Sequence, residues 1–137
     1  EKAIKLLDDI DLVGITYEIL DAMKYLHENK IIHCDLKVQN ILIDSNKHVK
    51  ICDFGISKNL DLTSQTSMSH GVGTLLYMAP ELFEPNAKYS KKIDVYSFGI
   101  VAYFIFSKGK YPDFKSKFDK YKIFNPKLHL YITRKKT

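Results

Sequence analysis

Two short stretches of this chain carry the side chains best suited to catalysis. Residues 33–40 read His-Cys-Asp-Leu-Lys-Val-Gln-Asn and set Asp35, Lys37 and Asn40 close together, and Asp53 opens an Asp-Phe-Gly string thirteen positions after Asn40. A carboxylate can accept a hydroxyl proton, and a lysine can neutralise a transferring anionic group. Amide and carboxylate oxygens are the ligands that Mg²⁺ prefers. The set therefore indicates phosphoryl transfer from a Mg-bound nucleotide to a hydroxyl.

The surrounding pattern predicts elements that bring these stretches together. A helix from about Asp11 to Asn29 is expected from an apolar stripe at three- and four-residue spacing. That stripe consists of Leu12, Ile15, Ile19, Ala22, Met23 and Leu26. Residues 41–43 and 49–51 predict two strands around a turn at 44–47, so the hairpin should place Asn40 beside Asp53.

A second helix is predicted over residues 93–106, which are almost continuously apolar. The run is shorter than the roughly 20 residues that a membrane span requires. A helix that is apolar on all sides is usually buried in a domain core. Asp94 lies at its start, where a buried acid can accept backbone N–H groups, and its expected role is structural.

Two further strings complete a recognisable order. Residues 73–81 read Gly-Thr-Leu-Leu-Tyr-Met-Ala-Pro-Glu, and residues 94–99 read Asp-Val-Tyr-Ser-Phe-Gly. Together with the first two, they resemble the C-terminal lobe of a protein kinase of the Ser/Thr type, with tyrosine-kinase-like features. The resemblance implies an α+β, mainly α-helical fold with a small β-hairpin. It is clearest over residues 10–114, with residues 115–137 a basic tail of uncertain fold.

The resemblance also assigns roles to individual residues. Asp35 and Lys37 would be catalytic, the first at the substrate hydroxyl and the second at the transferring phosphoryl group. Asn40 and Asp53 would bind Mg²⁺ and, with it, ATP. These are the family's roles carried over to matching positions of this chain.

Two more positions are assigned with an alternative left open. Leu42 would form the floor under the adenine of ATP, although a core residue is the plainer interpretation. Thr74 would lie near the substrate hydroxyl, beside Asp35 and Lys37, although it is also interpreted as a turn residue after Gly73. Residues 53–81 would form the activation segment, in which the hydroxyls of Thr63, Ser64, Thr66, Ser67 and Ser69 are candidates for phosphorylation; a plain solvated loop is the alternative interpretation of this stretch.

One departure from the family concerns regulation. Cys34 stands where many kinases have an arginine that binds a phosphate on the activation segment. A thiol forms no charge-assisted pair with phosphate. Activation is therefore expected to depend less on a phosphate at this point.

The chain is expected to be a partial kinase domain over residues 1–137. The Gly-rich loop, the strand lysine and its partner glutamate belong to an N-terminal lobe, which would precede Glu1 in a parent protein. The expected function is transfer of the ATP γ-phosphate to protein Ser/Thr hydroxyls in signalling. The alternative is a catalytically silent kinase-like fragment that acts as a binding or regulatory module. The isolated chain would bind Mg-ATP weakly.

Composition and charge agree with one globular unit. The chain has 137 residues, 45% of them hydrophobic, and residues 108–137 carry net +8 against net −3 for residues 1–107. A basic, aromatic-rich tail suits nucleic acid, but a solvated kinase surface is favoured, so nucleic acid is not the expected partner. Cys34 and Cys52 form neither a metal motif nor a disulfide framework, which indicates a reducing, cytoplasmic compartment.

Overall fold

The computed structural model describes residues 7–60, 74–83 and 87–112. In chain order, the elements are α1 (Asp9–Glu28), β1 (Ile31–Ile32), the 3₁₀ turn η2 (Val38–Asn40), β2 (Ile41–Ile43), β3 (Val49–Ile51), β4 (Lys58–Asn59), the 3₁₀ turns η3 (Thr74–Leu76) and η4 (Pro80–Phe83), and α2 (Lys91–Phe106). Two helices and short antiparallel strands match the predicted α+β, mainly helical class.

Helix α1 forms where the apolar spacing predicts it, beginning two residues earlier. Asp8 caps its N-terminus, accepting the N–H of Asp11 at 2.7 Å, which satisfies one of the free donors of the first turn. The predicted stripe faces the core, with five of its members buried and Ala22 partly exposed. This face packs against Leu36 and Tyr77 and against Ile100, Val101 and Ile105 of α2.

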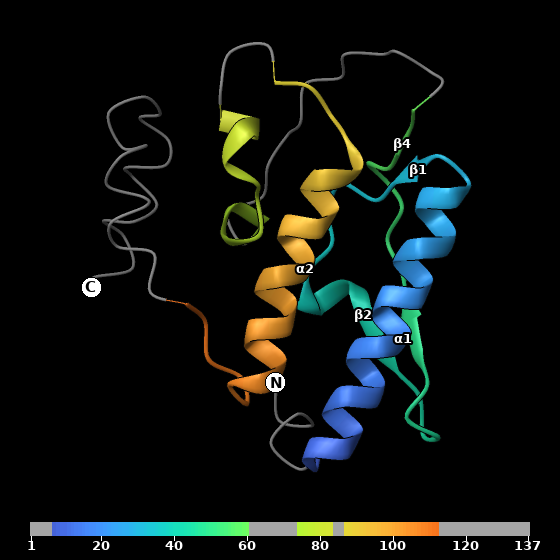
Figure 1. The fold of residues 1–137 in the computed structure, drawn as a ribbon, viewed down its shortest axis with the longest axis vertical. Coiled ribbons are helices and arrows are strands. Elements are labelled where there is room, and N and C mark those ends of the chain that lie inside the picture. The colour runs from blue at the N-terminus through green and yellow to red at the C-terminus, as the bar shows by residue number, and fades with distance from the viewer. Residues whose placement is uncertain (1–6, 61–73, 84–86, 113–137) are drawn as a thin grey trace.

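Helix α2 lies beside α1, as Figure 1 shows. Ser90 caps it by accepting the N–H of Lys92 at 3.3 Å, so the helix begins two residues before the predicted start. The prediction that it is buried on all sides is wrong for the described chain, since Val95, Tyr103 and Phe106 are at least half exposed. Its other face contacts α1 and Tyr77, and that one-sided packing leaves these side chains in solvent.

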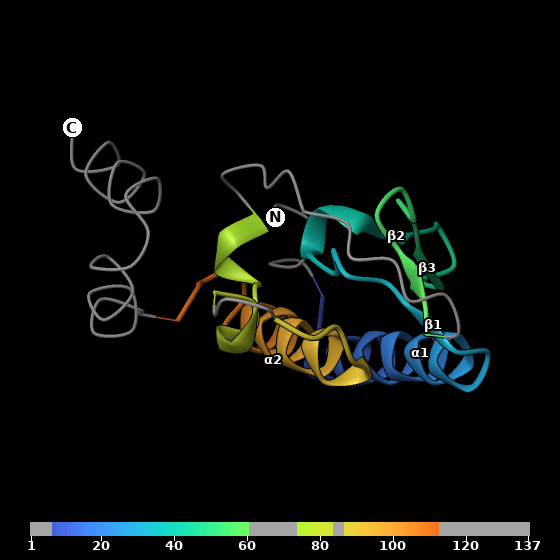
Figure 2. The ribbon, with the colours of Figure 1, turned by 90° about the horizontal axis from the view of Figure 1, so that it is seen from above.

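Strands β2 and β3 form the predicted antiparallel hairpin, with Ile41 opposite Ile51 and Ile43 opposite Val49. Strand β1 pairs separately with β4, joining Ile32 to Lys58. In Figure 2 the two helices form one layer, and β2 and β3 lie on one side of it. The loop between β1 and β2, which carries Asp35, packs on the two helices through Leu36.

The turn of the β2–β3 hairpin is tied to α1 by Glu18. Its carboxylate accepts the Val49 N–H at 2.6 Å and contacts the His48 imidazole Nδ1 at 3.0 Å. The backbone bond from Val49 and the His48 bond lower the pKa of Glu18 below its usual 4.5. The Glu18 bond raises the pKa of His48 above its usual 6.5.

These two shifts predict a pH window for the contribution of the pair to stability. The Glu18 contribution is present above its usual pKa of 4.5 and is lost as the pH falls through its lowered value. The His48 contribution is present below its usual pKa of 6.5 and is lost as the pH rises through its raised value. His48→Gln should therefore lower the melting temperature most between pH 4.5 and pH 6.5, the usual pKa values of the two groups. A melting difference that does not vary from pH 5 to pH 9 would contradict the prediction, and titration of His48 by NMR gives its pKa directly.

Within the described ranges, no helix is both long and apolar enough to cross a bilayer. The candidate phosphorylation sites at residues 63–69 and the basic tail from residue 115 lie outside the described residues.

Candidate active site

The loop after β1 brings three of the predicted site residues into contact. Lys37 Nζ lies 2.5 Å from Asp35 Oδ2, and Asn40 Nδ2 donates to the Asp35 carbonyl at 2.8 Å. The same Asn40 nitrogen is 3.3 Å from Asp35 Oδ2. The 3₁₀ turn η2 makes this possible, because its tight winding returns Asn40 to the residue five positions before it.

The two carboxylate oxygens of Asp35 differ in their surroundings. Oδ2 is held by Lys37 and Asn40. Oδ1 is hidden from solvent and has no hydrogen-bond partner within the described residues. A buried acceptor without a donor costs about 1–3 kcal/mol. The loop thus fixes the carboxylate through one oxygen and leaves the other in need of a donor.

The β2–β3 hairpin places Asn40 next to Asp53, as its geometry predicts. The Cys52 N–H donates to the Asn40 carbonyl at 2.9 Å, so the residue before Asp53 pairs directly with Asn40. Asp53 is exposed and has φ of 65°, a left-handed conformation that costs an L-residue about 1–2 kcal/mol. Its Oδ1 lies 3.4 Å from the Gly55 N–H.

The remaining two predicted site residues are Leu42 and Thr74, and the structure describes the side chain of Leu42 alone. Leu42 is 54% exposed, so the interpretation of it as a core residue is wrong for the described chain. Strand β2 presents Leu42 outward, away from the helices that bury other apolar side chains, and an exposed apolar floor remains compatible with a ligand. The backbone of Thr74 begins η3, but its side chain lies outside what the structure describes, so its expected place near Asp35 and Lys37 stays a prediction.

His33 connects the loop that carries Asp35 to the backbone next to Asp53. Its ring is buried, and Nδ1 accepts the Asp35 N–H at 3.2 Å. Nε2 therefore carries the proton and donates to the Cys52 carbonyl at 3.1 Å. The ring also packs on Phe54, with centroids 4.9 Å apart. His33 thereby joins the loop that carries Asp35 to the segment that carries Asp53. Its place two positions before Asp35 was the sequence signal for this role.

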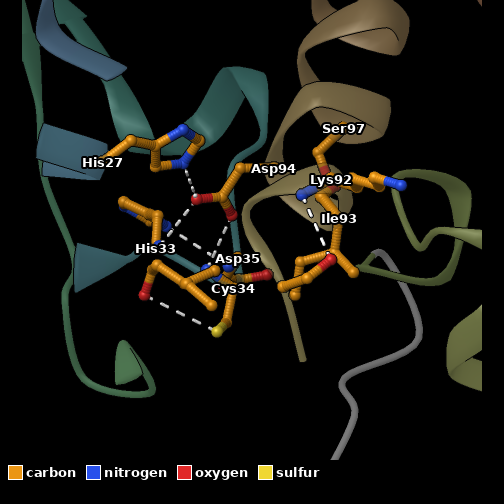
Figure 3. A network of polar contacts seen from close by, with 10 residues as sticks. His27, His33, Cys34, Asp35, Lys92, Ile93, Asp94 and Ser97 are labelled. Atoms are coloured by element: carbon orange, nitrogen blue, oxygen red, sulfur yellow. Dashed lines mark hydrogen bonds and ion pairs between the residues drawn. The ribbon is translucent and has the colours of Figure 1, made fainter. Parts of the chain in front are cut away.

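Asp94 braces the same loop from α2. Figure 3 shows its carboxylate pointing at the backbone of the loop, where it accepts the N–H of His33 and the N–H of Cys34, each at 2.9 Å. His27, in the last turn of α1, approaches Asp94 Oδ2 at 2.8 Å. The expected structural role is therefore seen in contacts to the loop, whereas Ser90 caps the helix that carries Asp94.

Cys34 turns its thiol into an apolar cluster with Ile32, Ala79 and Ile93. The Cys34 backbone is left-handed, with φ of 67°, and the residue is 8% exposed. Burial, together with the negative charge of Asp94, raises the pKa of the Cys34 thiol from 9.0 to about 12.

This environment predicts an unreactive thiol. A thiolate is the reactive form, and a rise of this size lowers its fraction at neutral pH by about a thousandfold. Iodoacetamide should therefore alkylate the partly buried Cys52 well before Cys34, as peptide mass spectrometry can resolve. In guanidinium chloride both cysteines should react at similar rates. Equal rates in the folded protein would contradict the proposed burial of Cys34.

The donor set of Asn40 and Asp53 fits a magnesium ion that is shared with a nucleotide. No cluster of three or more His, Cys, Asp or Glu side chains suited to a metal occurs in the described part of the chain. Mg²⁺ does not require one, since it is often held by one or two protein oxygens together with phosphates and water. Asn40 commits its amide nitrogen to Asp35, which leaves its amide oxygen as the atom for a hard cation.

Comparison with known proteins agrees with the class of protein that this loop and hairpin suggest. The model of the protein kinase domain family matches residues 2–134, and the chain belongs to this family. Serine/threonine-protein kinase RUNKEL of Arabidopsis thaliana is 43% identical over 97 residues, covering 71% of this chain and 7% of the relative.

Two animal kinases are similarly related. Serine/threonine-protein kinase fused of Drosophila melanogaster is 45% identical over 89 residues, which are 65% of this chain and 11% of the relative. Mitogen-activated protein kinase kinase kinase dlk-1 of Caenorhabditis elegans is 50% identical over 84 residues, 61% of this chain and 9% of the relative. The chain thus spans about a tenth of the length of these relatives.

Proposed function

We propose that this chain is the C-terminal-lobe part of an active protein kinase, which transfers the ATP γ-phosphate to Ser or Thr hydroxyls of protein substrates. Membership of the kinase family and similarity to Ser/Thr kinases support the reaction class. The domain would comprise residues 1–137, with the motif-bearing part at residues 10–114. An N-terminal lobe from the parent protein would complete the nucleotide site.

The observation that carries the proposal is the state of Asp35. Lys37 and Asn40 hold one of its oxygens, and the other is buried without a donor in the described residues. The Asp35 side chain keeps 11% of its surface exposed, so a substrate hydroxyl would reach the carboxylate there, and Asp35 would accept its proton as the oxygen attacks phosphorus. Lys37, fixed beside Asp35, would offset negative charge on the transferring group.

The remaining site residues would orient the nucleotide. Asn40 and Asp53 would hold Mg²⁺, which neutralises phosphate charge when it is bound. Leu42, exposed on β2, would contact the adenine. Thr74 would lie at the substrate hydroxyl. We infer a cytoplasmic protein from its two unpaired cysteines.

The test is a transfer assay with γ-labelled ATP, Mg²⁺ and a general protein substrate, on the intact protein that carries this chain. Labelled phosphoserine or phosphothreonine after acid hydrolysis is the expected result. Label on tyrosine alone would overturn the Ser/Thr assignment. Absence of transfer, with ATP bound, would favour the silent regulatory module.

A further inference from the structure

Lys58 and Tyr89 make a contact that the proposed reaction does not use. The Lys58 ammonium lies 3.4 Å from the centroid of the Tyr89 ring. Lys58 belongs to β4, and Tyr89 lies just before the N-cap of α2. Both residues are partly buried. A cation over an aromatic face is attracted by the negative charge of that face, and more strongly where water is excluded.

The contact lies against the loop that carries the catalytic residues. Tyr89 packs on the apolar cluster of Ile32, Cys34, Ala79 and Ile93. Lys58 is opposite Ile32 across the β1–β4 pair. Ile32 is the residue directly before His33. The pair therefore connects β4, the start of the catalytic loop and the segment leading into α2.

The contact between Lys58 and Tyr89 also affects Asp53, because only a short stretch of chain joins Asp53 to Lys58. Lys58 follows Asp53 by five positions, and the Ser57 N–H and hydroxyl both donate to the Phe54 carbonyl, at 3.1 and 2.8 Å. The Leu60 N–H donates to the Lys30 carbonyl at 2.9 Å and fixes the far side of β4. An anchored β4 thus limits where the turn after Asp53 can lie.

We propose that Tyr89 is a positioning residue, which holds β4 against the catalytic loop through Lys58 and so removes the need for a phosphate on the segment that follows β4. The inference rests on the proposed kinase function for its consequence, but its structural basis is independent of it. Cys34 supplies an apolar wall at this point and no cation. Tyr89 therefore gives Lys58 an uncharged partner within the protein itself.

The first test measures amide hydrogen exchange in the protein without nucleotide. Tyr89→Leu removes the ring and should speed exchange of the Leu60 amide by roughly threefold to thirtyfold. Tyr89→Phe keeps the ring and should stay near the wild-type rate. Lys58→Met keeps the aliphatic stem and should speed exchange at least as much as Tyr89→Leu, and the double variant should be no faster than Lys58→Met alone.

Several results would overturn the proposal. These are unchanged exchange at Leu60 in Tyr89→Leu, equal acceleration in Tyr89→Phe, or additive effects in the double variant. An equal acceleration at the buried amide of Ile19 in α1 would make Tyr89 a general packing residue and would also overturn it.

The second test measures phosphoryl transfer by the intact protein before and after phosphatase treatment. Wild type and Tyr89→Phe should keep their activity, while Tyr89→Leu should lose roughly tenfold to hundredfold, as misplaced catalytic groups do. Inactivation of the wild type by phosphatase would refute phosphate independence. If the wild type transfers no phosphate in either state, the proposed function fails, and the exchange result alone then decides the role of Tyr89.

Discussion

Asp35→Asn should lower the turnover number for phosphoryl transfer by about 10²–10⁴-fold, the usual contribution of a positioned acid or base. The substitution keeps the size of the side chain, and an amide oxygen can still accept from Lys37, which lies 2.5 Å from Oδ2. What it removes is the second carboxylate oxygen, Oδ1, which is buried and lacks a donor in the described residues. The change therefore separates proton acceptance from loop geometry.

The measurement is a steady-state assay of the intact protein with γ-labelled ATP, together with thermal unfolding of each variant. Asp21→Asn is a matched control, since this exposed acid of α1 undergoes the same chemical change away from the loop. We expect the control to keep wild-type turnover and both variants to melt close to the wild type. An Asp35→Asn protein that keeps more than about a tenth of the activity would remove Asp35 from the role of base.

Local pattern was sufficient to predict the elements that support this site. The spacing of Leu12, Ile15 and Ile19 predicts α1 because a helix buries one side, and these residues are indeed its buried face. The hairpin followed from two β-branched runs around a polar turn, and its register sets Asn40 beside Cys52. These predictions succeeded because each depends on neighbours within about one turn of helix or one hairpin.

Contacts between residues far apart in the sequence could not be predicted from local pattern. His27 reaches Asp94 across 67 positions, and nothing in the spacing of a lone histidine indicates that partner. Lys58 on Tyr89 likewise depends on how β4 meets the segment before α2. The exposure of Val95 and Phe106 was also unpredictable, because an apolar run does not specify which of its faces the rest of the chain covers.

Asp94→Ala should lower the free energy of unfolding by about 3–5 kcal/mol, the range for removing one partner of a buried charged network. Asp94 is 1% exposed, and its carboxylate serves the His33 N–H, the Cys34 N–H and the ring of His27. Alanine leaves those donors without an acceptor and opens a cavity at the same place. Denaturant titration of both proteins provides the measurement.

Asp21→Ala shows how much free energy of unfolding is lost when an exposed acid is replaced by alanine, and it serves as the control for Asp94→Ala. Asp21→Ala, at an exposed position of α1, should stay within about 0.5 kcal/mol of wild type. An Asp94→Ala loss no larger than that of Asp21→Ala would mean that the network does not support the fold.

His27→Ala tests how the network divides its stabilisation. It removes one donor and leaves the Asp94 carboxylate with two backbone N–H groups, so it should cost less than Asp94→Ala, about 1.5–3 kcal/mol. The double variant should cost less than the sum of the two, since both substitutions remove the same 2.8 Å contact. Because the two backbone donors belong to residues directly before Asp35, Asp94→Ala should also reduce phosphoryl transfer where the protein remains folded. His27→Ala, which leaves both backbone bonds in place, should reduce it less.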